Sequence, residues 1–97
     1  MTTGNNRFML KLYIAGMSPQ SRRAIDNIKN ICEEYLQDKY DLEVIDLYQN
    51  PGLSKGEQII AVPTLIKKLP SPLQHIIGDL SEREKVLVGL DLIEDTQ

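Results

Sequence analysis

The stretch AGMSPQSRRA, residues 15–24, decides the fold prediction, because it joins a strand-like run to a helix-like run. In residues 8–14, FMLKLYI, every second side chain is apolar, which favours a β-strand. Ser18 is a residue type that caps helix N-termini, and Pro19 suits the first helical position. The four residues SPQS, 18–21, have the spacing of a Cys-Pro-x-Cys redox site in which hydroxyls replace both sulfurs. The stretch therefore predicts a strand-to-helix turn that is built like a redox site but has no thiols.

A long amphipathic helix and a second strand follow this turn. Apolar residues recur at intervals of three and four from Ala24 to Leu36, which predicts a helix of roughly five turns. Residues 41–48, DLEVIDLY, predict a strand that ends at the turn sequence of residues 50–52. A strand, a helix and a strand in this order predict a right-handed βαβ unit with parallel strands. Cys32 lies within the apolar stripe, so we expect a buried side chain rather than a reactive thiol.

The second half of the chain has shorter elements and more prolines. Ser54 and Glu57 have the spacing of a capping box, which predicts a short helix. The run IIAVPTLIKK, residues 59–68, is strand-like, and its Pro63 must lie at an edge, a bulge or a strand start because proline cannot donate to the ladder. Residues 75–79, HIIGD, predict a short strand, and a last element follows it.

Length and composition limit the classes of function. The 97 residues, 41% hydrophobic and 26% charged, have room for one domain. We predict a flexible tail at 1–7, a single domain at 8–93 and a short acidic tail at 94–97. The chain has one cysteine and one histidine, Cys32 and His75, which cannot build an internal disulfide or a zinc site, so we expect no metal and no cofactor. The net charge of −3 argues against nucleic acid as a partner.

The N-terminal sequence and the apolar runs bear on location. The start of the chain lacks the cationic region of a signal peptide, and Lys11 interrupts its apolar run. No apolar stretch approaches the ~20 residues that a membrane-spanning helix needs. We therefore expect a cytoplasmic protein without membrane contact, and because a core of this size is marginal, we expect an oligomer or a partner.

Two local features together give this α/β chain a resemblance to the thioredoxin fold. One is SPQS at 18–21, and the other is AVPT at 61–64, which looks like the loop where thioredoxin-like proteins hold a cis-proline. Thiol–disulfide exchange needs a thiolate, and neither Ser18 nor Ser21 can supply one. We therefore interpret Ser18 as a helix cap and predict no enzymatic activity.

Two arginines, Arg22 and Arg23, lie in the first turns of the predicted helix, where the helix dipole disfavours cations. Two interpretations remain open. The arginines are either solvated surface charges or a basic contact patch for an acidic partner.

Beyond the fold, the chain closely resembles the KaiB family, the small components of the cyanobacterial KaiABC circadian clock. The resemblance runs from about Leu10 to Leu92 and rests on LKLYIAG, SRRAIDNI, VIDLYQNP, VPTLIKKLPSP and above all IIGDLSEREKVLVGLDL. It implies a non-enzymatic regulator that binds the N-terminal ring of KaiC, a hexameric ATPase, and so creates sites for KaiA and for clock-output histidine kinases. It also implies a fold switch between a tetrameric ground state, βαββααβ in order, and a monomeric thioredoxin-like state that binds KaiC.

The chain departs from the clock members of this family in two places. It ends at IEDTQ without their longer acidic tail, and Gln74 and His75 stand where they carry an arginine pair. Homologues in bacteria without KaiA are associated with stress responses. Two alternative functions are therefore stress adaptation with a KaiC-type protein but without KaiA, and a stand-alone sensor-like interaction module for a histidine kinase.

Residues 82–93 fit neither a helix nor a strand cleanly. Read as a helix, the segment is capped by Ser81 with Glu84 three residues later, but Gly89 costs the helix interior ~1 kcal/mol. Read as a strand, it contains Gly89 and Asp91, which are poor strand residues. We therefore predict that the second half of the chain is bistable.

The predicted fold-switch region also contains Pro63, Pro70 and Pro72, and any isomer change there would slow interconversion. We expect a homo-oligomer, a tetramer or dimer, to hold the ground state. Replacing Gly89 by alanine should favour the terminal helix and thus the thioredoxin-like monomer, and so should any change at Asp91 that destabilises the strand.

Overall fold

The computed structural model describes residues 7–54, 56, 59 and 61–94, and it has the thioredoxin-like order of elements. The elements are β1 (Phe8–Ile14), α1 (Pro19–Ile31), the π-helical turn η1 (Cys32–Leu36), β2 (Tyr40–Asp46), the 3-10 turn η2 (Pro51–Ser54), β3 (Thr64–Leu69), β4 (Gln74–Ile77) and α2 (Arg83–Gly89). No helix formed by the described residues is long and apolar enough to cross a membrane.

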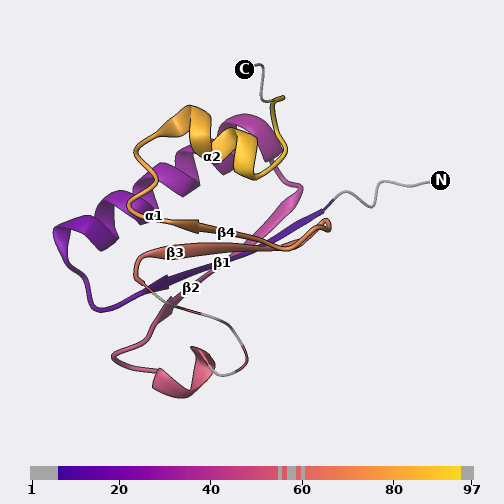
Figure 1. Cartoon of the computed structure of the whole chain (residues 1–97). Helices are drawn as coiled ribbons and strands as arrows, with labels where there is room; N and C mark the ends of the chain where they lie inside the picture. Colours follow the sequence, from indigo (N-terminus) through magenta and orange to yellow (C-terminus); the bar gives the residue numbers. More distant parts are fainter. Residues whose placement is uncertain (1–6, 55, 57–58, 60, 95–97) are drawn as a thin grey trace.

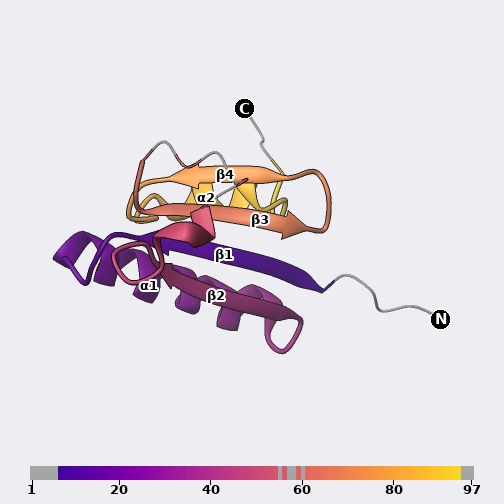
Figure 2. The same cartoon turned by 90° about the horizontal axis from the view of Figure 1, so that it is seen from below.

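The four strands form one mixed sheet in the order β2-β1-β3-β4. β1 and β2 run parallel, as the predicted βαβ unit requires, whereas β3 is antiparallel to β1 and β4 is antiparallel to β3. Both helices lie on one face of the sheet, with α1 over the β1–β2 side and α2 over the β3–β4 side (Figures 1 and 2). The thioredoxin-like fold prediction is confirmed.

Strand β1 lies at the centre and is buried on both faces. Leu10, Leu12 and Ile14 point toward the helices and belong to the larger core, which α1 and α2 complete. Tyr13 points to the opposite face, where it packs in a smaller cluster with Ile45 and Ile66; Leu47, Ile59 and Val62 also pack there. In Figure 2 the turn η2, which follows β2 in the chain, lies in front of this second face.

Helix α1 begins and continues as the sequence predicts. Ser18 is its N-cap in extended backbone geometry, its hydroxyl accepts a hydrogen bond from the Ser21 amide, and Pro19 follows at the first position. The helix passes directly into η1 and ends at Gln37, whose φ of 50° stops it. Cys32 is fully buried within this stretch, which confirms the predicted core position.

A buried ion pair connects β3 to the end of α2. Lys67 is fully buried on the helix-covered face, and its Nζ lies 3.0 Å from Oδ2 of Asp91, whose side chain is half exposed. Asp91 follows α2 with a φ of 61°, in the left-handed region that is common after helix ends. Because a buried ammonium without a partner is costly, this pair favours the docked position of the C-terminal segment.

Two predictions for the second half of the chain need correction. Ser81 does not cap α2: the N-cap residue is Glu82, which makes no capping hydrogen bond through its side chain. The Ser81 amide instead donates to the Asp79 carboxylate, and the N-cap of α2 lies one residue later than the sequence predicted. The helix that was predicted to begin after Ser54 is also wrong at its N-terminus, because Ser54 is the last residue of a 3-10 turn. The other residue of that capping box, Glu57, lies outside the described residues.

The two predicted tails are only partly within the described residues. Residues 1–6 and 95–97 lie outside them. Arg7 forms an ion pair with Asp41 at 2.8 Å and donates to the carbonyl oxygens of Asp38 and Tyr40. Arg7 therefore contacts the fold rather than standing apart from it.

Gly89 is the last residue of α2 and lies against β4. A Cβ added to Gly89 would be 2.8 Å from Cδ1 of Ile76 and 3.2 Å from its Cγ1. An alanine here gains the helix propensity that glycine lacks, up to ~1 kcal/mol, but requires the Ile76 side chain to move. In this fold, the gain in helix propensity from Gly89→Ala is therefore opposed by a steric clash with Ile76.

We predict that the two effects separate in a double-mutant cycle. Gly89→Ala should stabilise the Ile76→Val protein more than the parent, by about 1 kcal/mol, because valine lacks Cδ1. Urea-induced unfolding of the four proteins measures the coupling. Gly52→Ala is the matched control, since a Cβ at Gly52 meets nothing within 4 Å and its effect should be the same in both backgrounds. A Gly89→Ala effect that is equal in both backgrounds would contradict the contact.

Candidate functional site

Three loops meet at one end of the sheet, on the left in Figure 1. They are the β1–α1 turn, the segment that leads into β3, and the β4–α2 loop. Helix α1 also begins there, so its N-terminus lies at the end of the sheet where both parallel strands finish. This loop cluster is the position of the sequence-predicted redox frame.

The redox frame holds a pair of serines. The Ser18 hydroxyl accepts from the Ser21 amide at 3.1 Å and donates to the Ser21 hydroxyl, also at 3.1 Å. Ser21 is buried, whereas Ser18 is exposed. The Ser18 hydroxyl thus caps the helix, as the sequence predicts, the Ser21 hydroxyl is bonded to it, and neither can act as a leaving group in thiol–disulfide exchange.

The single thiol is remote in both position and reactivity. Cys32 lies at the far end of α1 and is fully buried. Burial, and then the charge of Glu33, raise the pKa of the Cys32 thiol to about 12. At neutral pH almost no thiolate forms, so Cys32 does not replace the missing redox pair.

The segment before β3 has the predicted cis-proline. The Val62–Pro63 bond is cis, and the Pro63 carbonyl accepts from the Gly78 amide at 2.9 Å. This hydrogen bond connects the β3 entrance to the β4–α2 loop. Pro63 therefore lies directly before a strand, one of the positions that its missing donor allowed.

Asp79 joins the β4–α2 loop to α1. Its carboxylate pairs with Nε of Arg23 at 2.9 Å and accepts from the Ser81 amide at 3.0 Å, and its carbonyl accepts from the Asn27 side chain. The hydrogen bond from Ser81, and then that from Arg23, hold the pKa of the Asp79 carboxyl below its usual range. The arrangement keeps the next residue, Leu80, buried in the core although its φ is 65°.

The two arginines of the predicted contact patch differ. Arg23 is engaged within the chain, because it pairs with Asp79. Arg22 is exposed, and no ion pair of its guanidinium is found among the described residues. Of the two, Arg22 is the side chain that a partner could use.

Sequence reasoning missed an exposed apolar surface beside the serines. Oδ1 of Asp46 accepts from the amides of Gly16 and Tyr48, both at 2.9 Å, and so joins the β1–α1 turn to the end of β2. Gly16 has a φ of 74°, and a Cβ there would come within 3.1 Å of the Tyr48 ring. Tyr48 is 77% exposed and Met17 is 60% exposed. The ring of Tyr48 is positioned by Gly16, more than thirty residues away in the sequence, so the residues around Tyr48 give no local signal of this surface.

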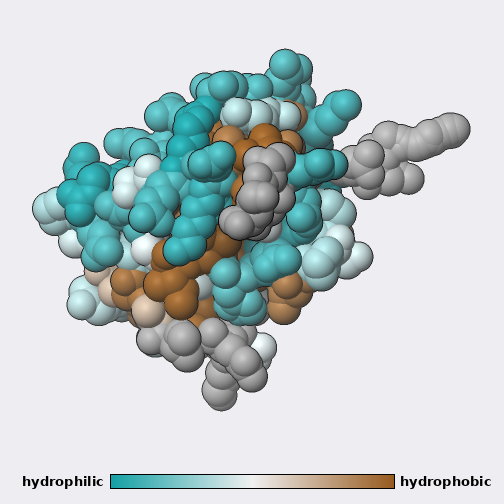
Figure 3. Space-filling model, turned by 45° about the horizontal axis from the view of Figure 1, so that its top comes forward, coloured by the Kyte–Doolittle hydropathy of each residue, from teal (hydrophilic) through white to brown (hydrophobic). Residues whose placement is uncertain are grey.

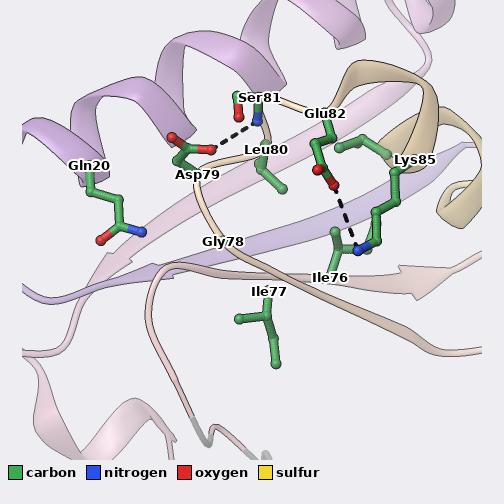
Figure 4. A pocket seen from close by; sticks show the side chains of 10 residues that line it. Gln20, Ile76, Ile77, Gly78, Asp79, Leu80, Ser81, Glu82 and Lys85 are labelled. Atoms are coloured by element: carbon green, nitrogen blue, oxygen red, sulfur yellow. Dashed lines mark hydrogen bonds and ion pairs between the residues drawn. The ribbon is translucent and has the colours of Figure 1, made fainter.

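A shallow cavity of about 300 Å³ opens between the N-terminus of α1 and the start of α2. Figure 4 shows Gln20 on one side, Asp79 and Ser81 at the top, and Glu82 opposite Lys85 on the other side. Its carboxylates already have partners, Asp79 in Arg23 and Glu82 in Lys85. No group of three potential metal ligands is found among the described residues. The cavity walls thus offer hydrogen-bonding groups and charges for contact with a partner.

The predicted fold-switch residues fall into two places. Pro63 lies in the loop cluster, and Pro70 and Pro72, both preceded by cis bonds, lie in the β3–β4 connection at the other end of the sheet. Gly89 and Asp91 lie at the end of α2, where they contact β4 and β3 respectively. The structure therefore does not gather these residues into one site.

The sequence matches a known family over most of its length. The family model described as the KaiB domain covers residues 11–92. The circadian clock oscillator protein KaiB of Microcystis aeruginosa is 53% identical over 93 residues, which are 96% of this chain and 89% of that protein. Circadian clock protein KaiB3 of Synechocystis sp. is 52% identical over 90 residues, 93% of this chain and 88% of that protein.

Solved structures repeat the fold. The N-terminal domain of Synechococcus elongatus SasA is similar with a TM-score of 0.71 and 23% identity, covering 95% of this chain and 90% of that chain. Chloroplastic thioredoxin z is similar with a TM-score of 0.71 and 17% identity, covering 90% and 79%. At these identities the likeness concerns the fold alone. The family match and the identity to curated circadian clock proteins confirm the resemblance, and the chain belongs to the KaiB family.

Proposed function

We propose that this protein is a non-enzymatic regulator that binds the N-terminal ATPase ring of a KaiC-type protein in its thioredoxin-like form. The observation that carries the proposal is the loop cluster, where a thioredoxin-like frame presents hydroxyls instead of thiols and is braced by contacts within the chain. Asp79 braces the β4–α2 loop, and Asp46 braces the β1–α1 turn. A rigid surface without reactive groups supports binding rather than catalysis.

The chemistry of the exposed side chains supports a protein partner. Met17 and Tyr48 offer apolar area beside the start of α1, where Arg22 stands exposed. Aromatic, methionine and arginine side chains are enriched in the cores of protein interfaces. The partner surface should therefore combine an apolar patch with an acidic group near Arg22.

The proposal also includes further proteins that bind the complex of this chain with the ring. KaiA and a clock-output histidine kinase would bind the ring-bound chain if it serves a KaiABC-type clock. Since Gln74 and His75 replace the arginine pair of clock members, stress adaptation with a KaiC-type protein but without KaiA is the alternative. A second alternative is a stand-alone sensor-like interaction module for a histidine kinase.

We also propose that the second half of the chain can leave the thioredoxin-like order for a tetrameric ground state. Among the described residues, the segment after β4 is attached to the rest of the fold by the Lys67–Asp91, Arg23–Asp79 and Arg83–Glu34 ion pairs and by the hydrogen bond from the Asn27 side chain to the Asp79 carbonyl. A change at Asp91 also acts on the thioredoxin-like state, because it removes the ion-pair partner of buried Lys67. The balance between the two states is thus set by a few contacts.

The protein should show no thiol–disulfide activity. Insulin reduction in the presence of dithiothreitol should match a boiled control, and Cys32→Ser should change nothing. The variant Ser18→Cys/Ser21→Cys is the positive control, since the two hydroxyl oxygens are 3.1 Å apart and two thiols there should form a reducible disulfide. Turnover by the parent that disappears in Cys32→Ser would sink the non-redox assignment.

Arg22→Glu should weaken binding to the cognate ring by about tenfold or more, because it places a carboxylate opposite the acidic group of the partner. Added salt should weaken binding of the variant less than binding of the parent, because salt screens a repulsion in the variant and an attraction in the parent. Biolayer interferometry between 50 mM and 500 mM salt measures both.

Lys29→Glu is the matched control, because Lys29 is an exposed cation at the other end of the same helix. Arg23→Glu is not suitable alone, since it also breaks the Asp79 pair. If Arg22→Glu binds as tightly as Lys29→Glu and the parent, Arg22 is a solvated surface charge and the partner docks elsewhere.

A further inference from the structure

The turn that follows β2 is fixed by the hydrogen bonds of four successive backbone amides. The Leu47 amide donates to the Ile14 carbonyl at 2.8 Å. The Tyr48 amide donates to Oδ1 of Asp46 at 2.9 Å. The amides of residues 49–50 both donate to the Asp46 carbonyl, at 3.0 Å and 2.9 Å. Three of the four amides thus donate to Asp46, which holds the backbone on both sides of Tyr48.

Tyr48 is 77% exposed although its backbone is held in this way. An aromatic side chain in water contributes little to the core, so the fixed turn gives the fold little through this ring. It does lower the conformational entropy that a partner loses by enclosing the ring, because the backbone beneath it is already ordered. The turn is therefore built for presenting Tyr48.

The ring of Tyr48 also lies against the β1–α1 turn. A Cβ built at Gly16 would be 3.1 Å from both Cδ2 and Cε2 of the ring, and the φ of Gly16 is 74°. The Gly16 amide donates at 2.9 Å to Oδ1 of Asp46, the same oxygen that accepts from the Tyr48 amide. One carboxylate oxygen therefore holds the two turns together, and the glycine leaves the space that the ring occupies.

The surroundings of the ring suit a protein partner. Met17, which follows Gly16, is 60% exposed. In Figure 3, apolar surface lies at the lower left, on the side of the loop cluster, below the hydrophilic side chains of the helices. Tyrosine is among the residues that contribute most of the binding energy when a partner's pocket encloses them.

We propose that Tyr48 is the anchor of the ring interface, the side chain that a pocket on the partner encloses, and that Asp46 is its positioning residue. This inference rests on the proposed function and deepens it, because it specifies an apolar pocket on the KaiC-type ring as the occupant of this surface. The contact is made by the aromatic ring, so phenylalanine should replace tyrosine without loss.

Binding of the full chain to the cognate ring, measured by biolayer interferometry, tests the anchor. Tyr48→Ala should raise the Kd at least tenfold, and Tyr48→Phe should raise it less than threefold. Leu73→Ala is the matched control, because Leu73 is a 53% exposed apolar residue in the β3–β4 connection, at the other end of the sheet. It should change the Kd less than twofold, and a loss equal to that of Tyr48→Ala would overturn the anchor.

A double-mutant cycle tests the positioning residue. Asp46→Ala should raise the Kd at least fivefold in the parent but less than twofold in the Tyr48→Ala background, since it acts through the ring. Asp46→Asn, which keeps an oxygen that can accept both amides, should stay within threefold of the parent. The loss of stability in urea should be similar in both backgrounds. A merely structural role would instead weaken binding equally in both, and that result would overturn the positioning role.

Gly16→Ala gives a second route to the same result if Asp46→Ala does not fold. Its Cβ displaces the ring directly, so it should weaken binding in the parent and not in the Tyr48→Ala background. The outcomes also separate this inference from the function on which it rests. A parent that does not bind the ring would overturn both, whereas a parent that binds no better than Tyr48→Ala would overturn the anchor alone.

Discussion

The structure depends on the burial of β1 on both faces. Leu12 and Tyr13 are neighbours that point to opposite sides of the sheet, and both are fully buried. Burying one face requires α1 and α2, and burying the other requires the smaller cluster around Ile45 and Ile66. Because β1 pairs with β2 on one side and with β3 on the other, every later element is positioned relative to it. The loop cluster lies where this strand ends, so the candidate partner surface follows from the same constraint.

Local patterns in the sequence were enough to predict the structure of the first half of the chain. The cap at Ser18, the long helix, the parallel strands and the buried Cys32 all follow from residue spacing within about forty positions. The cis bond before Pro63 was predicted from the resemblance to the thioredoxin fold rather than from residue spacing alone. What could not be predicted involves distant pairs, such as buried Lys67 with Asp91 or exposed Tyr48 against Gly16. A lysine in a strand and a tyrosine after one give no local signal of such partners.

The sequence predicted where the candidate site lies, but it did not predict which residues brace the loops or remain exposed for a partner. The serines correctly indicated which end of the sheet holds the candidate site. Their hydroxyls, however, serve the N-cap of α1 and are not the groups that a partner would contact. The side chains that distinguish this end are Asp79, which braces the loops, and Arg22, which remains exposed where its neighbour Arg23 is engaged. Sequence alone treats the two arginines alike, because the difference between them depends on a loop fifty-six residues further on.

The central claim is that the thioredoxin-like form is the one that binds a KaiC-type ring, and a covalent lock tests it most directly. Lys11 and Ile66 are Cα partners in the part of the β1–β3 ladder where the register is regular, so Lys11→Cys/Ile66→Cys in a Cys32→Ser background should form a disulfide that holds this fold. Binding of the oxidised and reduced protein to the cognate ring is then compared by stopped-flow fluorescence. The account predicts that the oxidised protein binds as tightly as the reduced one and without a slow phase. An oxidised protein that fails to bind while the reduced one binds would contradict it.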